Sequence, residues 1–307
     1  MVICSLSSEG AVMLYSLPIE VLTLVFKQLD SATDKLNFAL SCKKFLAATI
    51  KSYLPSPRVL RLSIGDCPSL ASVTRGETFL SVCQCAVHGS ADVLQYILPF
   101  MSRVLESIEL EEELTGGGIS DNHMSLLLAC CSQAPLTRLI MSRCDLRNVR
   151  PWTLSMLAHY DKLHEVAFEE CTIPISETLF IRSIASSFHC LTFFEITSNR
   201  IVTDRLARVL ARNCPLLEKY SVAGCPAVST FTALTLIETA FNRRNRMLQL
   251  HLQNTKFDSN LLARYMRSPL FPARNLWRLR PCQIDLGFEK YAILAEHEEA
   301  RCVLIYT

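Results

Sequence analysis

Hydrophobic residues recur in one spacing from about residue 59 to the end of the chain. Most copies have apolar residues at positions 1, 4 and 6, and a Cys or small polar residue at position 9. Positions 4 and 6 alternate with polar residues, which predicts a short β-strand with one buried face. The residues at position 6 are Leu110, Met141, Phe168, Ile196, Val222, Leu252, Leu279 and Ile305. Their separations are 31, 27, 28, 26, 30, 27 and 26 residues, which predicts stacked copies of one structural unit.

The two ends of this series depart from the regular period. Val59, Leu62 and Ile64 form the first copy, and 46 residues separate Ile64 from Leu110. We expect a helical insert over about residues 78–101 to fill that gap. At the other end, a weaker copy carries Leu279 and Cys282, and the pair Val303 and Ile305 predicts a truncated last copy.

Segments with helical spacing connect the strands, and each follows a residue type that caps helices. The predicted starts are Ser120, Ser176, Thr203 and Asp258, before residues 123–131, 180–187, 206–211 and 261–266. One strand and one helix cannot bury a core alone, so the units must stack. The pattern therefore predicts an α/β solenoid with strands on its concave face and helices on its convex face.

Fourteen cysteines in 307 residues are a high count. The apolar run at residues 11–15 has no basic residue before it, which is not typical of a secretory signal. We therefore expect a cytoplasmic or nuclear protein whose cysteines are thiols. Cys83-Gln84-Cys85 and Cys130-Cys131 lack the spacing of a zinc site, so neither a metal nor a cofactor is predicted. The cysteines expected at buried repeat corners are Cys67, Cys144, Cys171, Cys225 and Cys282.

The tract at residues 202–217, from Val202-Thr203-Asp204 through Asn213-Cys214-Pro215, resembles the cysteine-containing class of leucine-rich repeats. The resemblance covers about four fifths of the chain and implies about eight degenerate repeats over residues 55–307. Charge adds little, because 31 Lys and Arg residues against 29 Asp and Glu leave a net charge of +2. That balance disfavours nucleic acid as a partner, and no apolar run approaches the roughly 20 residues of a membrane span.

Residues 16–54 break the repeat and follow a 15-residue extension. Apolar side chains recur at helical spacing after Ser16, an expected cap, and a second helix is expected from about Lys35. The strings Leu17-Pro18-Ile19-Glu20-Val21-Leu22 and Leu40-Ser41-Cys42-Lys43-Lys44-Phe45 closely resemble the F-box motif. One departure is the absence of the Trp that many F-boxes carry near the second helix.

The F-box resemblance implies docking on the Skp adaptor, and through it on a cullin scaffold. The residues that it implies for this contact are Leu17, Pro18, Glu20, Leu22, Val25, Phe26, Leu29, Leu40, Cys42 and Phe45. A simpler interpretation is that the segment only caps the solenoid's N-terminal end, as every repeat array requires. Both interpretations can hold together.

Residues beside the inward strand positions face the concave side, because side chains alternate along a strand. The target-binding residues expected there are Glu109, Glu165, Phe193, Glu195, His251, Arg278 and Arg280. Their charges change from acidic to basic along the solenoid, which predicts a bipolar target. The alternative is an ordinary solvated face. A basic run at residues 243–246 likewise fits either a solvated helix end or recognition of an anionic partner.

The family resemblance implies a substrate-recognition subunit of a Skp–cullin–F-box ubiquitin ligase, which binds the adaptor through the F-box and its target through the repeats. Such a subunit is not an enzyme, because it supplies only proximity between target and ubiquitin carrier. One alternative is a leucine-rich-repeat scaffold that acts independently of ubiquitin ligation. Another is a cysteine-dependent enzyme, which would need an unusually reactive thiol.

Overall fold

A computed structural model gives the structure of the protein. It describes residues 16–30, 34, 38, 41–42, 44–45, 48–49, 59–65, 79–85, 105–112, 119–239, 247–268, 278–282, 291–296 and 301–307. The predicted N-terminal extension, the corner residue Cys67 and the basic run at residues 243–246 lie outside these ranges.

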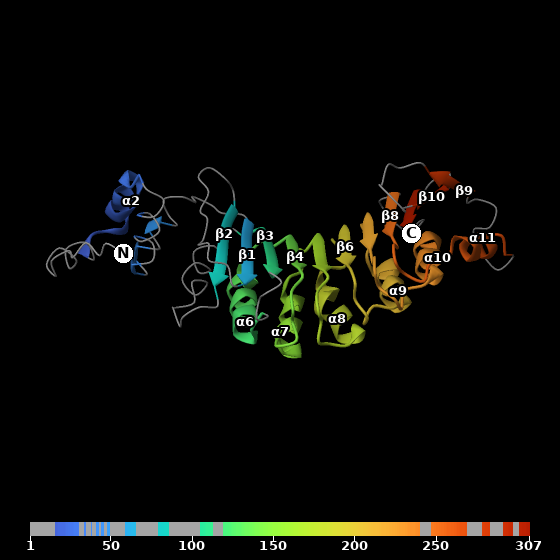
Figure 1. The fold of residues 1–307 in the computed structure, drawn as a ribbon, viewed down its shortest axis with the longest axis horizontal. Helices are drawn as coiled ribbons and strands as arrows, with labels where there is room; N and C mark the ends of the chain where they lie inside the picture. The colour runs from blue at the N-terminus through green and yellow to red at the C-terminus, as the bar shows by residue number, and fades with distance from the viewer. Residues whose placement is uncertain are drawn as a thin grey trace.

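The described strands form one 11-stranded sheet (Figure 1). They are β1 (Val59–Gly65), β2 (Phe79–Cys85), β3 (Ser107–Glu112), β4 (Arg138–Ser142), β5 (Glu165–Glu169), β6 (Phe193–Ile196), β7 (Lys219–Ser221), β8 (Met247–His251), β9 (Arg278–Cys282), β10 (Tyr291–Glu296) and β11 (Arg301–Tyr306). The order across the sheet is β2-β1-β3-β4-β5-β6-β7-β8-β11-β10-β9. Pairing is parallel from β2 to β11, whereas β10 pairs antiparallel with both β11 and β9.

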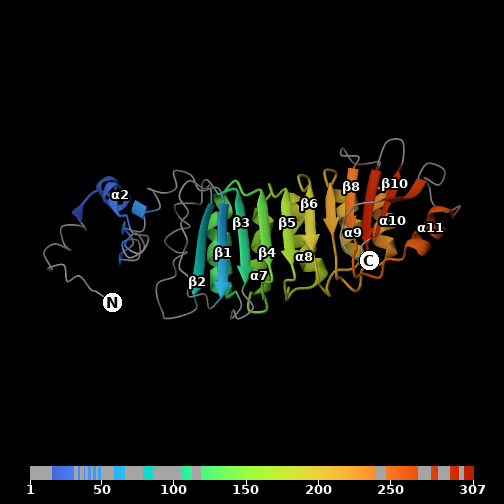
Figure 2. The ribbon, with the colours of Figure 1, turned by 45° about the horizontal axis from the view of Figure 1, so that its top comes forward.

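Helices cover one side of this sheet (Figures 1 and 2). They are α6 (Asp121–Cys130), α7 (Pro151–Ser155), α8 (Glu177–Ile184), α9 (Asp204–Asn213), α10 (Thr230–Glu238) and α11 (Ser259–Met266). Short 3-10 turns extend three of them, at Cys131–Gln133, Met156–His159 and Ala185–Ser187. Ser176, Thr203, Ser229 and Asp258 cap the helices that follow them through side-chain hydrogen bonds. The repeated strand–helix unit makes this a leucine-rich-repeat-like α/β fold.

The core lies between the strands and the helices. Position 4 of successive strands stacks in register as Leu139, Val166, Phe194 and Tyr220, all buried. The Phe194 and Tyr220 rings lie stacked with centroids 6.0 Å apart. One continuous hydrophobic cluster links these rows from Leu105 to Leu304. A hydrophobic cluster this long requires several stacked repeats, because no single strand–helix unit encloses its own apolar face.

A ladder of polar contacts at the strand ends joins each repeat to the one before it. The Cys171 thiol lies 3.2 Å from the Met141 carbonyl, and the Cys225 thiol lies 3.3 Å from that of Ile196. Asn199 replaces the cysteine in one repeat and donates from its amide to the Cys171 carbonyl at 2.9 Å. The corner role predicted for Cys144, Cys171 and Cys225 is therefore confirmed, and all three are buried.

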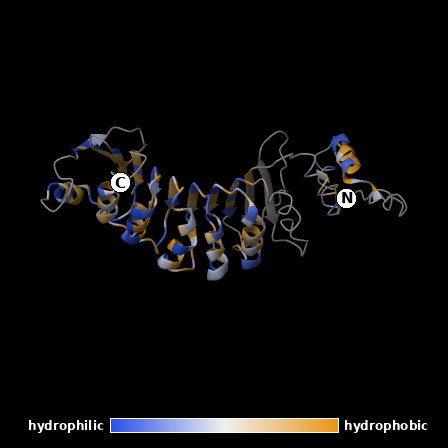
Figure 3. Cartoon of the chain, turned by 180° about the vertical axis from the view of Figure 1, so that it is seen from behind, coloured by the Kyte–Doolittle hydropathy of each residue, from blue (hydrophilic) through white to orange (hydrophobic). Residues whose placement is uncertain are grey.

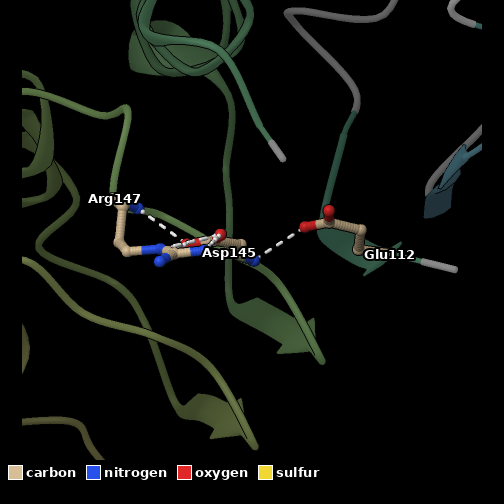
Figure 4. A network of polar contacts seen from close by, with 3 residues as sticks. All are labelled: Glu112, Asp145 and Arg147. Carbon is tan, nitrogen blue, oxygen red and sulfur yellow. Dashed lines mark hydrogen bonds and ion pairs between the residues drawn. The ribbon is translucent and has the colours of Figure 1, made fainter. Parts of the chain in front are cut away.

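Acidic side chains hold the turn after β4 (Figure 4). Buried Glu112, at the end of β3, accepts a hydrogen bond from the Asp145 backbone N–H at 2.7 Å. The Asp145 carboxylate accepts bonds from the Arg147 guanidinium, which lower the pKa of Asp145. Figure 4 shows this network bridging β3 to the turn after β4, so the ladder continues to the edge of the fully described repeats.

A second ladder runs along the helix N-termini. The Asp204 carboxylate, at the start of α9, accepts hydrogen bonds from the Ser229 hydroxyl and the Thr232 hydroxyl. Glu177, at the start of α8, accepts in the same way from Thr203. Each acidic residue thereby fixes the helix start of the next repeat, which aligns the helices parallel to one another.

The structure corrects the predictions for both ends of the repeat array. Residues 79–85 form strand β2 on the outer side of β1, so the segment is not wholly helical. Leu62 pairs with Leu110, which shifts the first copy by two residues from the predicted register. At the other end β11 pairs with β8, and Leu304 aligns with Leu250, so Val303 and Ile305 lie on the opposite face from the predicted one. Cys282 ends strand β9 and is not a repeat corner.

Helix α2 (Ile19–Gln28) forms the first described element, and Pro18 occupies its N-cap position without a side-chain hydrogen bond. Ser16 therefore does not cap the helix, contrary to expectation. Phe38, Lys44 and Phe45 are helical where the structure describes the region of the second predicted helix. No helix in the described part of the chain combines the length and hydropathy needed to cross a membrane.

Candidate interaction surfaces

The side of the sheet opposite the helices carries two aligned rows of side chains, which we call the open face. The first row runs from Arg138 through Glu165, Phe193 and Lys219 to Gln249. The second row runs through Glu109, Ile140, Ala167, Glu195, Ser221 and His251. Five of the seven residues expected to bind a target are in these rows. Arg280 extends the first row across Leu294 and Val303, and Arg278, two residues before it on the same strand, lies on the same face.

Arg138 is a member of the open face that the sequence analysis did not identify. Its guanidinium Nη1 lies 3.2 Å from Glu109 Oε1, and its Nε lies 2.9 Å from Glu165 Oε2. One arginine therefore bridges two of the predicted acidic target residues. Position 3 of the repeat would have identified it, since Arg138 precedes Leu139 as Glu165 precedes Val166.

Serine hydroxyls hold two further carboxylates of the open face. Ser142 donates to Glu169 at 2.9 Å, and Ser221 donates to Glu195 at the same distance. A neutral donor leaves the carboxylate charge in place, unlike the guanidinium at Glu165. The negative charge of this region therefore lies chiefly at Glu169 and Glu195.

Small and aromatic side chains lie between these carboxylates. Ala167 is only 1% exposed, since it is flanked by longer side chains on its own and neighbouring strands. Phe193 is partly exposed, and the Lys219 ammonium lies 4.6 Å from the centroid of its ring. An apolar floor rimmed by carboxylates is suited to a long cationic side chain, whose stem is apolar and whose head is charged.

Arg278 and Arg280 lie at the far end of the sheet, on β9. Both are exposed, and three strands, β8, β11 and β10, separate them from Lys219 on β7. Arg301 on β11 pairs with Glu296 on β10 at 3.3 Å. The acidic and basic ends of the open face are therefore separate regions, and His251 lies between them.

The N-terminal segment has a small hydrophobic cluster of its own. Leu22, Phe45 and Ala48 form its centre, with Leu17, Ile19, Phe38 and Cys42 packed against it. The rings of Phe38 and Phe45 are stacked with centroids 4.5 Å apart. Leu22, Phe26 and Phe45 are buried within the chain itself, and their part in an adaptor contact stays a prediction. They support the segment from inside.

The remaining predicted adaptor residues differ in accessibility. Pro18 and Glu20 are exposed, whereas Leu17, Val25, Leu29 and Cys42 are partly exposed, and Leu40 lies outside the described residues. The predicted adaptor set omits the two most accessible apolar side chains of α2, Val21 at 38% and Leu24 at 61% exposure. Figure 3 shows hydrophobic residues over much of this helix. Exposed apolar side chains on one side of a helix are typical of a surface that packs against another molecule.

Three described cysteines have pKa shifts that oppose nucleophilic thiol chemistry. Burial raises the pKa of Cys225, and hydrogen bonding to Cys171 together with burial raises that of Cys144. The pKa of the half-buried Cys190 is also raised, by desolvation and by Asp161. A nucleophilic thiol needs the opposite shift. Within the described residues, no cluster of three His, Cys, Asp or Glu side chains is arranged to hold a metal ion.

No protein-family model matches the chain, and neither does any curated protein sequence. Among solved structures, the chain is similar to one from the crystal structure of the TLR13-ssRNA13 complex, with 11% sequence identity and a TM-score of 0.32. That match covers 66% of this chain and 30% of the other, so this chain spans less than a third of the protein it matches.

Proposed function

We propose that the chain is a substrate-recognition subunit of a Skp–cullin–F-box ubiquitin ligase. Residues 16–54 bind the Skp adaptor, and the repeat region at residues 55–307 binds the target protein. The observation that carries the proposal is a helix, α2, with its own small core on one side and exposed Val21 and Leu24 on the other. A segment this short buries too little apolar surface to be stable on its own. A partner that covers Val21 and Leu24 would therefore stabilise it.

The proposed adaptor surface combines the opening of α2 with its exposed side. Leu17 and Pro18 precede the helix, and Val21 and Leu24 follow at helical spacing. The buried Leu22, Phe26 and Phe45 keep this surface in shape. The protein itself makes and breaks no bond, uses no cofactor, and acts inside the cell, in the cytoplasm or nucleus, by bringing the target close to the ubiquitin carrier.

For the target, the open face favours a segment with a basic residue. Five carboxylates, counterbalanced by Arg138 and Arg143, leave three net negative charges between β3 and β6. These carboxylates are Glu109, Glu111, Glu165, Glu169 and Glu195. We propose that a lysine or arginine of the target lies over Ala167, with its charged end near Glu169 and Glu195, while an acidic or phosphorylated part lies near Arg278 and Arg280.

Co-purification with the Skp adaptor separates this proposal from the alternative, a repeat scaffold that acts without a ligase. The full chain should retain a purified Skp adaptor, and Leu17→Ala with Pro18→Ala should abolish retention, because an interface anchor commonly contributes about 1–2 kcal/mol or more. A matched control is Glu169→Lys with Glu195→Lys, which alters the open face alone. Failure of the wild-type chain to retain the adaptor would favour the scaffold.

A further inference from the structure

Helices α8 to α11 present a surface that neither the proposed adaptor contact nor the open face uses. Exposed arginines occupy three of these helices: Arg182, Arg205, Arg208, Arg212 and Arg264. We call this surface the arginine face. Within the same four helices, Glu238 is the exposed carboxylate, whereas Glu177 and Asp204 accept bonds from the next repeat. Asp258, just before α11, caps that helix. The surface therefore carries a clear excess of positive charge in a molecule that is nearly neutral overall.

Helix α9 is the centre of the arginine face. Leu206, Ala207, Leu210 and Ala211 turn one side of the helix into the core. Arg205, Arg208 and Arg212 occupy the other side at spacings of three and four residues, which spans about 10 Å along the helix. Arg205 donates to the Thr178 hydroxyl at 2.8 Å, so it is tied to α8. Within the described residues, Arg208 and Arg212 make no ion pair.

Exposed apolar side chains flank this row on both sides. On α8, Leu179 is 45% exposed, and on α10, Phe231 is 51% exposed. The Phe231 ring contacts that of Tyr265 on α11, with centroids 5.3 Å apart. Helices α9 and α10 are joined through Asp204 and Ser229, and α10 and α11 through Thr230 and Asp258, so these side chains belong to one surface.

The residue types decide which class of anionic partner fits. All the cationic side chains of α8 to α11 are arginines, and arginine and aromatic residues are enriched at protein interfaces where lysine is depleted. Nucleic-acid binding draws on a broad basic field, which a chain of net charge +2 does not have. Membrane binding needs a larger apolar area than Leu179, Phe231 and Tyr265 supply.

We propose that the arginine face binds an acidic helical segment of a protein partner. Carboxylates spaced three or four residues apart would meet Arg208 and Arg212, and an apolar side chain would pack on Phe231 and Tyr265. The site differs from both surfaces of the proposed function, so the protein can hold this partner together with the adaptor and the target.

The test measures binding of a fluorescein-labelled helical peptide of Glu, Leu and Ala to the full chain. Fluorescence anisotropy of the peptide reports the affinity. Reversing Arg208→Glu with Arg212→Glu should weaken peptide binding at least about fivefold, because two exposed pairs are lost and replaced by repulsion. Reversing Arg200, an exposed arginine in the turn after β6, is the matched control and should change affinity less than about twofold. Phe231→Ser should weaken binding even at high salt, where charge is screened.

The proposal is overturned if the wild-type chain does not bind the peptide, or if Arg208→Glu with Arg212→Glu binds it as tightly as wild type. Should the double reversal unfold, Arg208→Gln with Arg212→Gln repeats the measurement without added repulsion. Oligo(dT) and phosphatidylserine vesicles are titrated in parallel. Tighter binding of either than of the peptide contradicts the choice of a polypeptide partner.

Discussion

Gly224 lies so close to Ser198 that a Cβ on Gly224 would stand 2.9 Å from the Ser198 Oγ. The two residues occupy the same position in successive repeats, the turn immediately before the corner residue. Both have a positive φ, as do Arg143, Glu170 and Asn254 at the equivalent positions. The turns therefore stack through a backbone conformation that the repeat imposes on whichever residue falls there.

Gly224→Ala should destabilise the protein by about 1–3 kcal/mol, since it adds both the left-handed strain and the close contact. Urea unfolding monitored by circular dichroism measures the loss. Adding Ser198→Gly to this variant should restore part of the stability, because the Oγ contact disappears. Equal stability of wild type and Gly224→Ala would contradict the packing of these turns.

Two buried tyrosines offer a matched comparison. The Tyr160 hydroxyl donates to the Leu128 carbonyl at 2.6 Å, whereas the Tyr220 hydroxyl has no hydrogen-bond partner in the described part of the chain. Tyr160→Phe should cost about 1–3 kcal/mol of unfolding free energy, because it removes a buried hydrogen bond. Tyr220→Phe should be neutral or stabilising by about 1 kcal/mol. A larger loss for Tyr220→Phe than for Tyr160→Phe would be incompatible with these contacts.

Stability should fall at alkaline pH. Burial raises the pKa of Tyr220 and Cys225 in the folded protein, so their protons are held in the native state and released on unfolding. The stabilisation is complete below the ordinary thiol pKa of about 8.5 and is lost as pH rises toward the raised values. Denaturant midpoints measured between pH 8 and about 11 should decrease. Tyr220→Phe should flatten the part of the decline above the ordinary tyrosine pKa of about 10, and an unchanged slope would argue against burial of that hydroxyl.

Arg138→Met should change the free energy of unfolding by less than about 1 kcal/mol, although it removes two ion pairs. The side chains of Arg138 and Glu165 are 43% and 44% exposed, so solvent screens the attraction. The same substitution removes the guanidinium from Glu109 and Glu165 on the open face. Arg200→Met serves as the control in urea unfolding, and a loss well above that of the control would show that the bridge is structurally important.

The sequence predicts the regular part of the fold well, because each repeat states its own pattern. Alternation at positions 4 and 6 and a small corner residue identify the β4 to β8 repeats, including the buried Cys144 and Cys171. The same pattern does not predict the strand pairing at the two ends of the repeat array. The placement of β11 between β8 and β10 depends on pairing between strands, and a spacing count carries no information about partners.

The sequence likewise predicts the candidate surfaces only in part. Alternation places Glu165 and Glu195 on one face, but Arg138 becomes their neighbour only when the register of β3, β4 and β5 is known. In the N-terminal segment, the apolar period identifies α2 but cannot separate buried Leu22 from exposed Leu24, because both are apolar. Three-dimensional packing makes that distinction.

The central claim is that α2 binds the Skp adaptor, and isothermal titration of the purified adaptor into the full chain tests it most directly. Leu24→Glu places a charge on the exposed side of α2 without touching its buried core. Trp152→Glu, which alters another exposed apolar side chain, on α7, is the control. The account predicts one adaptor per chain for wild type and Trp152→Glu, and an affinity loss of about tenfold or more for Leu24→Glu. No binding by wild type, or equal affinity for wild type and Leu24→Glu, would contradict it.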